Sequence, residues 1–381
     1  MKEQISELVA TVHDRPGMVV LVTAGAGTQA LAWLLGVGGA SRTLLEARVP
    51  YAASAFDDFL GLTPGQYAAP PTAARLAGRA LQRAHQLEDH ASPLVGLACS
   101  ATIVTDRPKR GQHRAHVVAW TATGVRRYSL VLEKGARDRT GEETLVSHLI
   151  LNTLAETLDV PARLDLPLGQ RDKLSQARHD FAAAMGRVVG GARSHFAITP
   201  TGQVAHTYQP KAVLSGAFNP LHEGHLRLAA TAAELLQAPV TFELAVVNAG
   251  KATLQQNEAL RRLTQFAGAH AVIASAAPRF DQKAELFPNT VFVVGYDTAR
   301  RVLEERFYDN SHEQLLAALR RIRTAGCRFL VAGRADAEGR FHPADELAPP
   351  AGYSDLFEPV PADRFRLDIS STELRRRAAA D

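Results

Sequence analysis

The sequence predicts an α/β protein of two domains, and three observations support this prediction. The chain has 381 residues, which is more than a single hydrophobic core usually supports. Short β-branched apolar runs alternate with longer helical stretches, a pattern typical of helices packed on mostly parallel sheets. A stretch rich in proline, glycine and threonine, near 199–209, separates two such series. Each series is therefore expected to form its own domain.

The first series begins with a short apolar run that a glycine turn interrupts. Strands are predicted at 18–22, 43–49, 94–100 and 116–121, and helices at 29–35, 70–86 and 140–158. A mixed stretch follows, with a helix predicted over 172–189, just before two glycines. The N-terminal domain is thus predicted to span 1–165, and 166–208 to form a connector.

The second series opens at Lys211 and is predicted to form a domain over 209–381. Strands are predicted at 213–214, 241–247, 291–294 and 328–331, and helices at 224–237, 257–268, 301–306, 313–323 and 371–380. This repeated strand-then-helix order again favours an α/β arrangement.

Composition and charge narrow the classes of function. Hydrophobic residues make up 46% of the chain and charged residues 22%, a balance typical of globular proteins. The formal net charge of +4 is mild and no long basic tail is present, so nucleic acid is not an expected partner. The two cysteines, Cys99 and Cys327, lie far apart and form no disulfide framework, which fits a reducing compartment.

One stretch, 17–41, carries no charge and is long enough to span a bilayer. Its six glycines cluster where a strand would turn into a helix, so a buried strand and a buried helix are predicted there instead. The first residues are acidic rather than basic, unlike the start of a signal peptide. We therefore expect a cytoplasmic protein without membrane contact.

The stretch 215–225, SGAFNPLHEGH, is the most informative for chemistry. It lies between a predicted strand and a predicted helix. Gly216 allows a sharp turn after the strand, and Gly224 lets a phosphate approach the backbone. His225 falls in the first helical turn, where free amide groups and the helix dipole favour an anion. Together with His222 it can hold phosphate oxygens as negative charge develops on a leaving pyrophosphate.

A His-x-x-His pair also suits a metal ion, or two unrelated surface histidines. No third ligand lies nearby at a familiar spacing, so no metal site is predicted.

The complete stretch resembles the signature of the nucleotidylyltransferase superfamily, a glycine–aromatic–proline loop followed by His-x-Gly-His. A second stretch, ISSTELR at 369–375, resembles the superfamily's Ile-Ser-Ser-Thr-x-(Ile/Val/Leu)-Arg. The resemblance covers about 209–381 and implies a Rossmann-like domain with a parallel sheet. Ser370 and Glu373 also fit a capping box for the last helix, and both interpretations can hold.

The resemblance implies roles for individual residues. The implied catalytic residues are His222, His225 and Arg375, and Arg375 is expected to contact the β- or γ-phosphate of the nucleotide. The implied nucleotide-binding residues are Gly216, Phe218, Asn219, Gly224, Asp297, Ser370, Ser371 and Thr372. The implied substrates are ATP or CTP, with Mg²⁺, and a phosphorylated small-molecule acceptor.

Within the superfamily, the order of features is most similar to nicotinamide or nicotinate mononucleotide adenylyltransferases. VGYD at 294–297 resembles their Gly-x-Asp and implies that Asp297 holds a ribose hydroxyl, unless this aspartate only caps a helix. VNAGK at 247–251 resembles their loop after the second strand and implies that Lys251 meets the acceptor's phosphate, unless it is a solvated surface lysine. Arg261 or Arg262 matches their basic position.

The tryptophan that these enzymes stack on the nicotinamide ring has no evident counterpart. Tyr296 is the first choice for an acceptor-binding substitute, with Phe307 and Tyr308 as alternatives. The identity of the acceptor, and the choice of ATP or CTP, therefore stay open.

The turn GAGTQA at 25–30 satisfies the dinucleotide-binding pattern Gly-x-Gly-x-x-Ala between a strand and a helix. This signal is weak, because no acidic residue ends the following strand at the expected distance. Glu46 lies in the middle of that strand.

Residues 15–160 have a closer resemblance to the C-terminal domain of CinA, the nicotinamide mononucleotide deamidase family. GGAS at 38–41, VPYA at 49–52 and GLACSAT at 96–102 carry it. Gly25 stands where those deamidases place a serine nucleophile, and Phe56 where they place a lysine. Thr28 and Ser41 lie nearby without an obvious base, so we predict a domain that does not hydrolyse amides.

The resemblance implies that this domain keeps a ligand pocket and forms homo-oligomers. The basic loop at 105–114 either holds a phosphate or is a solvated hairpin.

The sequence thus predicts an enzyme that transfers a nucleotidyl group, with adenylyl as the first choice, from a nucleoside triphosphate to an acceptor. Nicotinamide or nicotinate mononucleotide is the example, as in NAD biosynthesis. Two alternatives stay open: a nucleotide-binding sensor or scaffold without turnover, and a bifunctional enzyme with residual amidohydrolase activity in the N-terminal domain.

Overall fold

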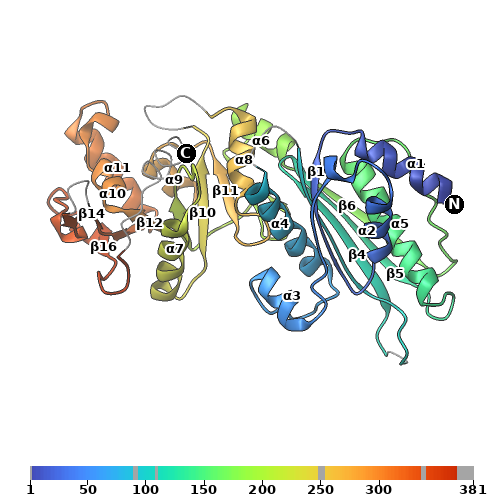
Figure 1. Cartoon of the computed structure of the whole chain (residues 1–381). Helices are drawn as coiled ribbons and strands as arrows, with labels where there is room; N and C mark the ends of the chain where they lie inside the picture. Colours follow the sequence, from blue (N-terminus) through green and yellow to red (C-terminus); the bar gives the residue numbers. More distant parts are fainter. Residues whose placement is uncertain (1, 89–92, 108–109, 248–253, 336–339, 367–381) are drawn as a thin grey trace. The chain divides into compact units, whose positions relative to one another are not determined.

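The computed structural model describes residues 2–88, 93–107, 110–247, 254–335 and 340–366 (Figure 1). The chain divides into two compact units, each built around one sheet. Unit 1 comprises Met1–Ala182, Ile198–Val204 and Thr264–His270, and unit 2 comprises Ala183–Ala197, Ala205–Leu263 and Ala271–Asp381.

The sheet of unit 1 has six strands in the order β2–β1–β3–β4–β5–β6. They are β1 (Met18–Ala24), β2 (Leu44–Arg48), β3 (Leu94–Thr102), β4 (His113–Thr121), β5 (Gly124–Leu132) and β6 (Lys173–Asp180). β1 pairs with β2 and β3 in parallel, whereas β4, β5 and β6 continue as an antiparallel meander. β1 and β3 are buried on both faces, which explains why their sequences are continuous apolar runs.

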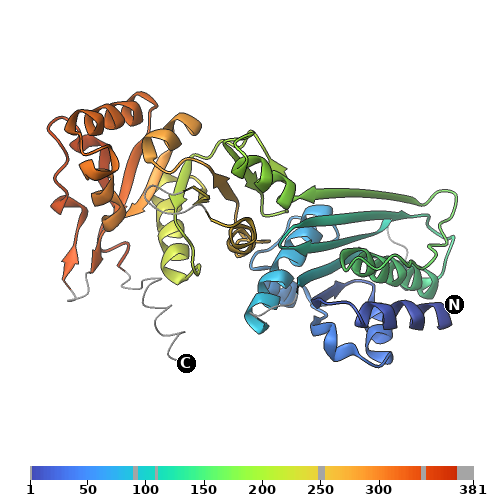
Figure 2. The same ribbon diagram turned by 90° about the horizontal axis from the view of Figure 1, so that it is seen from above.

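Helices cover both faces of this sheet (Figures 1 and 2). α1 (Lys2–His13), α2 (Thr28–Gly36) and α5 (Arg139–Thr157) share one apolar core with alternate residues of β1, β3 and β4. α4 (Pro70–Leu87) packs against β3 on the other face, and α3 (Ala53–Leu60) precedes it. A short helical turn, η1 (Ala40–Arg42), leads into β2.

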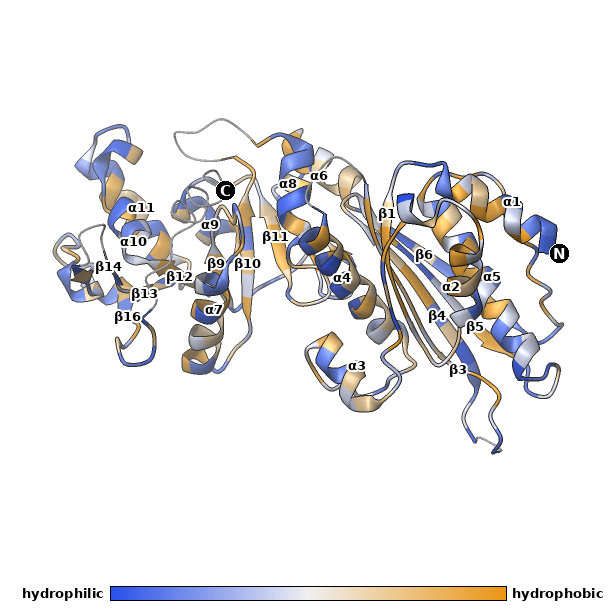
Figure 3. Ribbon diagram, viewed as in Figure 1, coloured by the Kyte–Doolittle hydropathy of each residue, from blue (hydrophilic) through white to orange (hydrophobic). Residues whose placement is uncertain are grey.

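The second sheet has eight strands in the order β16–β13–β12–β9–β10–β11–β7–β8. They are β7 (His195–Ile198), β8 (Val204–Ala205), β9 (Ala212–Ser215), β10 (Val240–Ala245), β11 (Val272–Ser275), β12 (Val291–Gly295), β13 (Arg328–Ala332) and β16 (Phe357–Pro359). From β11 across to β16 the strands pair in parallel. Apolar residues dominate these central strands, orange in Figure 3.

The strand order reverses at β9, and this reversal locates the site. The chain runs from β9 to β10 and β11 on one side, and then returns to place β12 and β13 on the other. In parallel sheets, ligands bind beyond the carboxyl ends of the strands at such a reversal.

Helices and short turns complete unit 2. The helices are α6 (Phe181–Val189), α7 (Glu223–Leu236), α8 (Gln256–Thr264), α9 (Phe280–Leu286), α10 (Tyr296–Val302) and α11 (His312–Thr324), of which α6 and α8 begin or end at a unit boundary. The short turns are η2 (Glu305–Phe307), η3 (Ala344–Glu346) and η4 (Ser354–Leu356), and a hairpin joins β14 (Arg334–Ala335) to β15 (Phe341–His342). Phe287, Phe292 and Phe329 are fully buried in the core that α9, α10 and α11 form with the sheet.

The predicted α/β class is confirmed, and so are most of the predicted strands and helices. The stretch 17–41 forms β1 and α2, as expected. Over the described residues, no helix is both long and apolar enough to cross a membrane.

Three expectations of secondary structure were wrong. The helix predicted over 172–189 is a helix only from Phe181, because 173–180 pairs with β5 as the edge strand β6. The segment 166–208, expected to be a connector, therefore adds a strand to the sheet of unit 1. The helix predicted over 301–306 is the end of α10 and a separate short turn, η2, and the helix predicted over 257–268 ends at Thr264. The helix predicted over 371–380 lies outside the described residues.

We predict that Gly96→Ala destabilises unit 1. A methyl group at Gly96 would lie 2.1 Å from the carbonyl oxygen of Ala77 and 2.3 Å from the backbone nitrogen of Leu81, because α4 rests directly on β3. Overpacking of this kind costs about 1–3 kcal/mol. Urea unfolding of the purified protein measures it.

Gly36→Ala is the matched control, since nothing lies within 4 Å of a methyl group at that position of α2. It should leave stability unchanged or raise it by up to about 1 kcal/mol, the helix propensity difference. Equal stability of the two variants would contradict the close packing of α4 on β3.

Candidate functional site

The candidate site begins at the turn between β9 and α7, which contains the SGAFNPLHEGH stretch. Phe218 folds back from this turn into the core, where it is 1% exposed and its ring packs edge-on against Phe242 at 5.6 Å. A side chain at Gly216 would lie 2.7 Å from the Phe218 ring, so only glycine fits there. Phe218 therefore anchors the turn to the core and does not face solvent. Asn219, which precedes a cis proline peptide, lies outside the lining of the two cavities described below.

His222 and His225 form a stacked pair at the start of α7. Their ring centroids are 3.8 Å apart with an interplanar angle of 29°. His222 is the N-cap residue, and its backbone N–H donates to Nδ1 of His225 at 3.4 Å. With Nδ1 as the acceptor, the neutral His225 ring carries its proton on Nε2. The rings of Phe218 and His225 also make an edge-to-face contact, with centroids 5.1 Å apart.

Both histidines are neutral near pH 7. Burial lowers the pKa of His225 to about 4, and the neighbouring His222 adds to this shift. Burial also lowers the pKa of His222. The pair therefore acts on an anion as hydrogen-bond donors rather than as cations.

A cavity of about 310 Å³ opens beyond the carboxyl ends of β9, β12 and β13. The described residues that line it include Gly216, Gly224, His222, His225, Gly295, Thr298 and Arg334. In the first turn of α7 the N–H of His225 donates to the His222 carbonyl at 2.9 Å, whereas those of Glu223 and Gly224 have no acceptor within the helix. The two histidine rings add side-chain donors beside this helix N-terminus. This arrangement suits a polyphosphate.

Asp297, in the first turn of α10, is not among the residues that line this cavity, although its neighbour Thr298 and its partner Arg334 are. Its carboxylate forms an ion pair with Arg334 of the β14–β15 hairpin, so a ribose hydroxyl would share this carboxylate with the arginine. Tyr296, the first choice for acceptor contact, stacks on His342 of the same hairpin, with ring centroids 5.3 Å apart. It lies outside the lining of both cavities of unit 2.

A second cavity, of about 240 Å³, lies on the other side of the same turn. Ser215, Gly216, Ala217 and Thr298 line both cavities. The second cavity alone is lined by three cations, Arg279, Lys283 and Arg301, and by the aromatic residues Phe280, Phe307 and Tyr308. Phe307 and Tyr308, the alternatives for ring stacking, thus line the second cavity.

A buried polar network supports the turn from below. Nζ of Lys283 lies 2.5 Å from Oε2 of Glu243 and donates to Ser215 Oγ at 3.2 Å. The other oxygen of Glu243 accepts from Ser275 at 2.5 Å. The backbone N–H of Gly216 donates to the carbonyl of Glu243 at 3.0 Å. Sequence reasoning missed this network, because its members come from four separate elements.

The basic position on α8 has a structural role. Arg262 is 9% exposed and donates to the carbonyl oxygen of Ala217 at 3.0 Å, while Glu258 orients its guanidinium at 2.6 Å. Arg262 therefore stabilises the turn through the Ala217 carbonyl. Arg261 forms a more exposed ion pair with the same glutamate, Glu258.

Five of the predicted site residues lie outside the described residues. They are Lys251, Ser370, Ser371, Thr372 and Arg375. Among the described residues of the whole chain, no group of three or more histidines, cysteines and acidic residues could hold a metal ion.

In unit 1, the turn that satisfies the dinucleotide pattern is occupied by a carboxylate of the protein itself. Glu143 of α5 accepts hydrogen bonds from the backbone N–H groups of Gly27 and Gln29, at 3.0 and 3.1 Å, and from the Thr28 hydroxyl at 3.0 Å. A helix N-terminus filled in this way leaves no place for a pyrophosphate. The dinucleotide interpretation of this turn is therefore not supported.

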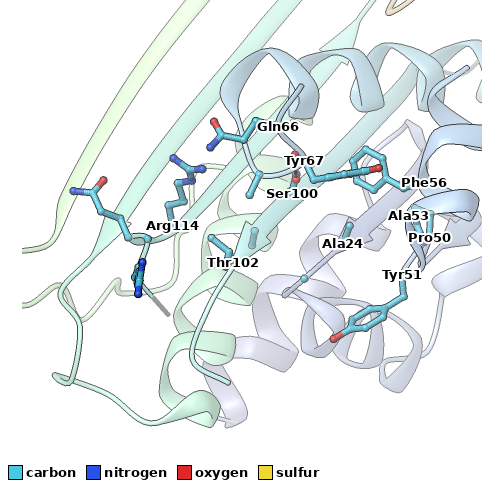
Figure 4. A pocket seen from close by; sticks show the side chains of 16 residues that line it. Ala24, Pro50, Tyr51, Ala53, Phe56, Gln66, Tyr67, Ser100, Thr102 and Arg114 are labelled. Atoms are coloured by element: carbon cyan, nitrogen blue, oxygen red, sulfur yellow. Dashed lines mark hydrogen bonds between the residues drawn. The ribbon is translucent and has the colours of Figure 1, made fainter. Parts of the chain in front are cut away.

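A large cavity of unit 1, about 730 Å³, lies beside this turn (Figure 4). Its walls include the aromatic residues Tyr51, Phe56 and Tyr67, and the basic residues Arg110 and Arg114. Phe56 is 3% exposed and packs edge-on against Tyr67 at 5.0 Å. No lysine or carboxylate is among its described lining residues.

Position 25 cannot carry a nucleophile in this backbone. Gly25 has φ +87°, and a side chain there would lie 1.9 Å from the carbonyl oxygen of Ala101. Of the nearby hydroxyls, that of Thr28 is bonded to Glu143 and that of Ser100 donates to the Tyr67 carbonyl at 2.7 Å. Ser41 is not among the residues that line the cavity.

Comparison with known families supports the resemblance found in the C-terminal part of the sequence. Residues 213–377 match the family described as cytidylyltransferase-like. This part of the chain therefore carries a cytidylyltransferase-like domain, which confirms the nucleotidyltransferase resemblance. No curated protein matches the chain.

Solved structures that match the chain include proteins of the competence/damage-inducible type. CihA from Agrobacterium tumefaciens is 19% identical, with 41% of this chain and 96% of that chain covered and a TM-score of 0.34. A CinA superfamily protein from Escherichia coli is 15% identical, with 40% and 90% covered and a TM-score of 0.31. A competence or damage-inducible protein from Enterobacter asburiae is 11% identical, with 42% and 96% covered and a TM-score of 0.31. Likenesses at this level say nothing about activity.

We predict that His225→Gln reduces the loss of stability on acidification. The pKa of His225 falls from its ordinary value of 6.5 to about 4 on folding. At pH values between these two, the unfolded chain therefore binds a proton that the folded chain does not. The free energy of unfolding therefore decreases as pH falls from about 6.5 to about 4. Denaturant unfolding across this range measures the slope for both proteins.

Glutamine keeps an acceptor for the His222 N–H but takes up no proton. The stability of the variant relative to the unmodified protein should accordingly rise as the pH falls through this window. Parallel curves for the two proteins would show that His225 is not buried as a neutral group.

Proposed function

We propose that the cytidylyltransferase-like domain is an active nucleotidyltransferase that transfers an adenylyl group from ATP to a phosphorylated acceptor and releases pyrophosphate. Nicotinate or nicotinamide mononucleotide is the proposed acceptor, and CTP is the second candidate nucleotide. The observation that carries this proposal is the neutral His222–His225 pair at the N-terminus of α7, which faces a cavity at the point where the strand order reverses.

The reaction requires one bond to form and one to break at the α-phosphorus of the nucleotide. An oxygen of the acceptor's phosphate forms the new P–O bond, and the bond from the α-phosphorus to the bridging oxygen breaks, so that pyrophosphate leaves with that electron pair. The acceptor oxygen is already anionic, so no strong general base is needed. Positioning and stabilisation of the developing charge are what the domain must supply.

The residues of the cavity match these two requirements. The N–H groups of the first turn of α7, with the donors of His222 and His225, suit the triphosphate. Gly216 lines both cavities, and because it has no side chain, nucleotide and acceptor could approach each other closely there. Because both histidines are neutral, they donate without a further protonation step near pH 7.

Mg²⁺ is the proposed cofactor, and bound to the nucleotide it neutralises phosphate charge. The described residues contain no cluster of ligands for the ion, which fits an ion held mainly by phosphate oxygens. Arg375 and the hydroxyls of Ser370, Ser371 and Thr372 are proposed to complete the triphosphate site.

For unit 1 we propose a domain that does not hydrolyse amides. The support is the backbone at Gly25, which has no room for a side chain, and the buried phenyl ring of Phe56 in place of an ammonium group.

The proposed activity is tested with His225→Ala. Pyrophosphate release is followed from ATP or CTP, with each of the two mononucleotides as acceptor. Loss of a donor that faces developing charge typically lowers turnover about 10²-fold or more, and we expect at least this loss. Unfolding curves of the variant establish that it is folded.

His312→Ala is the matched control, because His312 also lies at the start of a helix, α11, but is exposed and is absent from the lining of both cavities. It should turn over normally. Near-normal turnover by His225→Ala would sink the catalytic assignment. Binding of ATP without pyrophosphate release by the unmodified protein would favour the sensor alternative.

For unit 1, we predict that the full-length protein releases no ammonia from nicotinamide mononucleotide above the uncatalysed background. Gly25→Ser should not create the activity, because the new Cβ would clash with the carbonyl of Ala101 and because the φ of +87° at this position disfavours serine. An enzyme-coupled ammonia assay measures both proteins. Robust release by the unmodified chain would show that another group serves as nucleophile.

A further inference from the structure

We infer that the second cavity of unit 2 selects an acceptor that carries an ionised acid group on a planar ring, in addition to its phosphate. This inference rests on the proposed function and specifies the chemical class of the acceptor. It distinguishes a ring carboxylate from the corresponding neutral amide, which the cytidylyltransferase-like assignment leaves open.

The first step is the charge around the cavity. None of its described lining residues is acidic, and three are cations: Arg279, Lys283 and Arg301. Lys283 is neutralised by Glu243, with which it forms a buried pair at 2.5 Å. Arg279 and Arg321 share a single carboxylate, that of Asp281. Arg321 lies outside the lining and is also 3.9 Å from Glu285, so it does not rely on Asp281 alone. The lining itself therefore has three cations beside the two buried carboxylates of Glu243 and Asp281, and it stays positive overall.

The second step is the rigidity of Arg279. Its Nε and Nη2 donate to the two oxygens of Asp281 at 3.1 and 3.0 Å. Asp281 is 1% exposed, and Arg321 holds it from the other side at 2.5 Å. Because these bonds use Nε and Nη2, the guanidinium is fixed in place and its Nη1 is left for a ligand. The carboxylate also raises the pKa of Arg279, which keeps it charged.

The third step is where Arg301 and Arg279 lie. Arg301 follows Thr298 by three residues on α10, so both lie on one face of the helix. Thr298 lines both cavities, which places Arg301 beside the border where the acceptor's phosphate must meet the nucleotide. Arg279 lines the second cavity alone, with its guanidinium 5.5 Å from the ring centroid of Tyr308.

These positions match a ligand with two anionic ends. Its phosphate would lie against Arg301 and the Gly216 turn, and its ring against Phe307 and Tyr308. An acid group on the ring would then meet Arg279. A preoriented guanidinium binds a carboxylate by charge-assisted hydrogen bonds, whereas a neutral amide offers one carbonyl oxygen and an NH₂ group that cannot accept.

The test compares nicotinate mononucleotide with nicotinamide mononucleotide, which differ only in this group. Initial rates of pyrophosphate release with ATP or CTP give kcat/KM for each acceptor, and calorimetry gives the Kd of each without turnover. We expect a preference for the acid of at least about tenfold, the factor that corresponds to ~1.4 kcal/mol. Charge-assisted hydrogen bonds typically contribute this much.

Arg279→Met should abolish the preference by weakening binding of the acid while leaving the amide unchanged. Arg300→Met is the matched control for Arg279→Met. Arg300 is also an arginine of unit 2, but it is exposed and is absent from the cavity lining. This substitution removes the same charge and should keep the preference. Unfolding curves verify that both variants fold.

Equal use of the two acceptors, or preference for the amide, would overturn this inference and leave the proposed function standing. A preference for the acid in Kd without any turnover would support the inference and contradict the proposed activity. Binding of neither mononucleotide would overturn the inference. A preference that survives in Arg279→Met would also overturn it, since another group would then recognise the acid.

Discussion

Unit 2 depends on the buried ion pair between Glu243 and Lys283. Both side chains are almost fully buried, at 0% and 4% exposure, so neither charge can be hydrated if the other is removed. Loss of one partner of such a pair typically costs about 3–5 kcal/mol. The pair also joins three elements, because Lys283 on α9 donates to Ser215 at the end of β9 and Glu243 belongs to β10. It therefore fixes the turn on which both cavities of the unit are built.

That turn contributes to both cavities of the unit. Gly216 and its two neighbours in the chain line both cavities. Phe218 packs into the core behind the turn, and Arg262 of α8 donates to the carbonyl oxygen of Ala217. The two histidines and Arg334 line one cavity, while Arg279, Lys283 and Arg301 line the other. The candidate site thus consists of hydrogen-bond donors and charged side chains around a reversal in strand order, an arrangement that would suit the positioning of the proposed substrates.

Unit 1 uses the same place in its own sheet differently. Its turn after β1 also leads into a helix, but Glu143 occupies the N–H groups that an anion would need. A carboxylate held there stabilises the helix end and joins α2 to α5. The neighbouring cavity has arginines and aromatic rings in its walls, and Gly25 contributes only backbone. The two units therefore share a strand–turn–helix arrangement but not its chemistry.

The sequence by itself determined the α/β class, the helix start at His222 and His225, and the glycines that a tight turn requires, because each depends on neighbours in the chain. Only the tertiary structure decided that 173–180 is a strand, since pairing with β5 outweighs its local preference. The same holds for Glu143 at the Gly27 turn, for the pairing of Asp297 with Arg334, and for the cations of the second cavity. These contacts join residues tens of positions apart, and no local pattern records such distances.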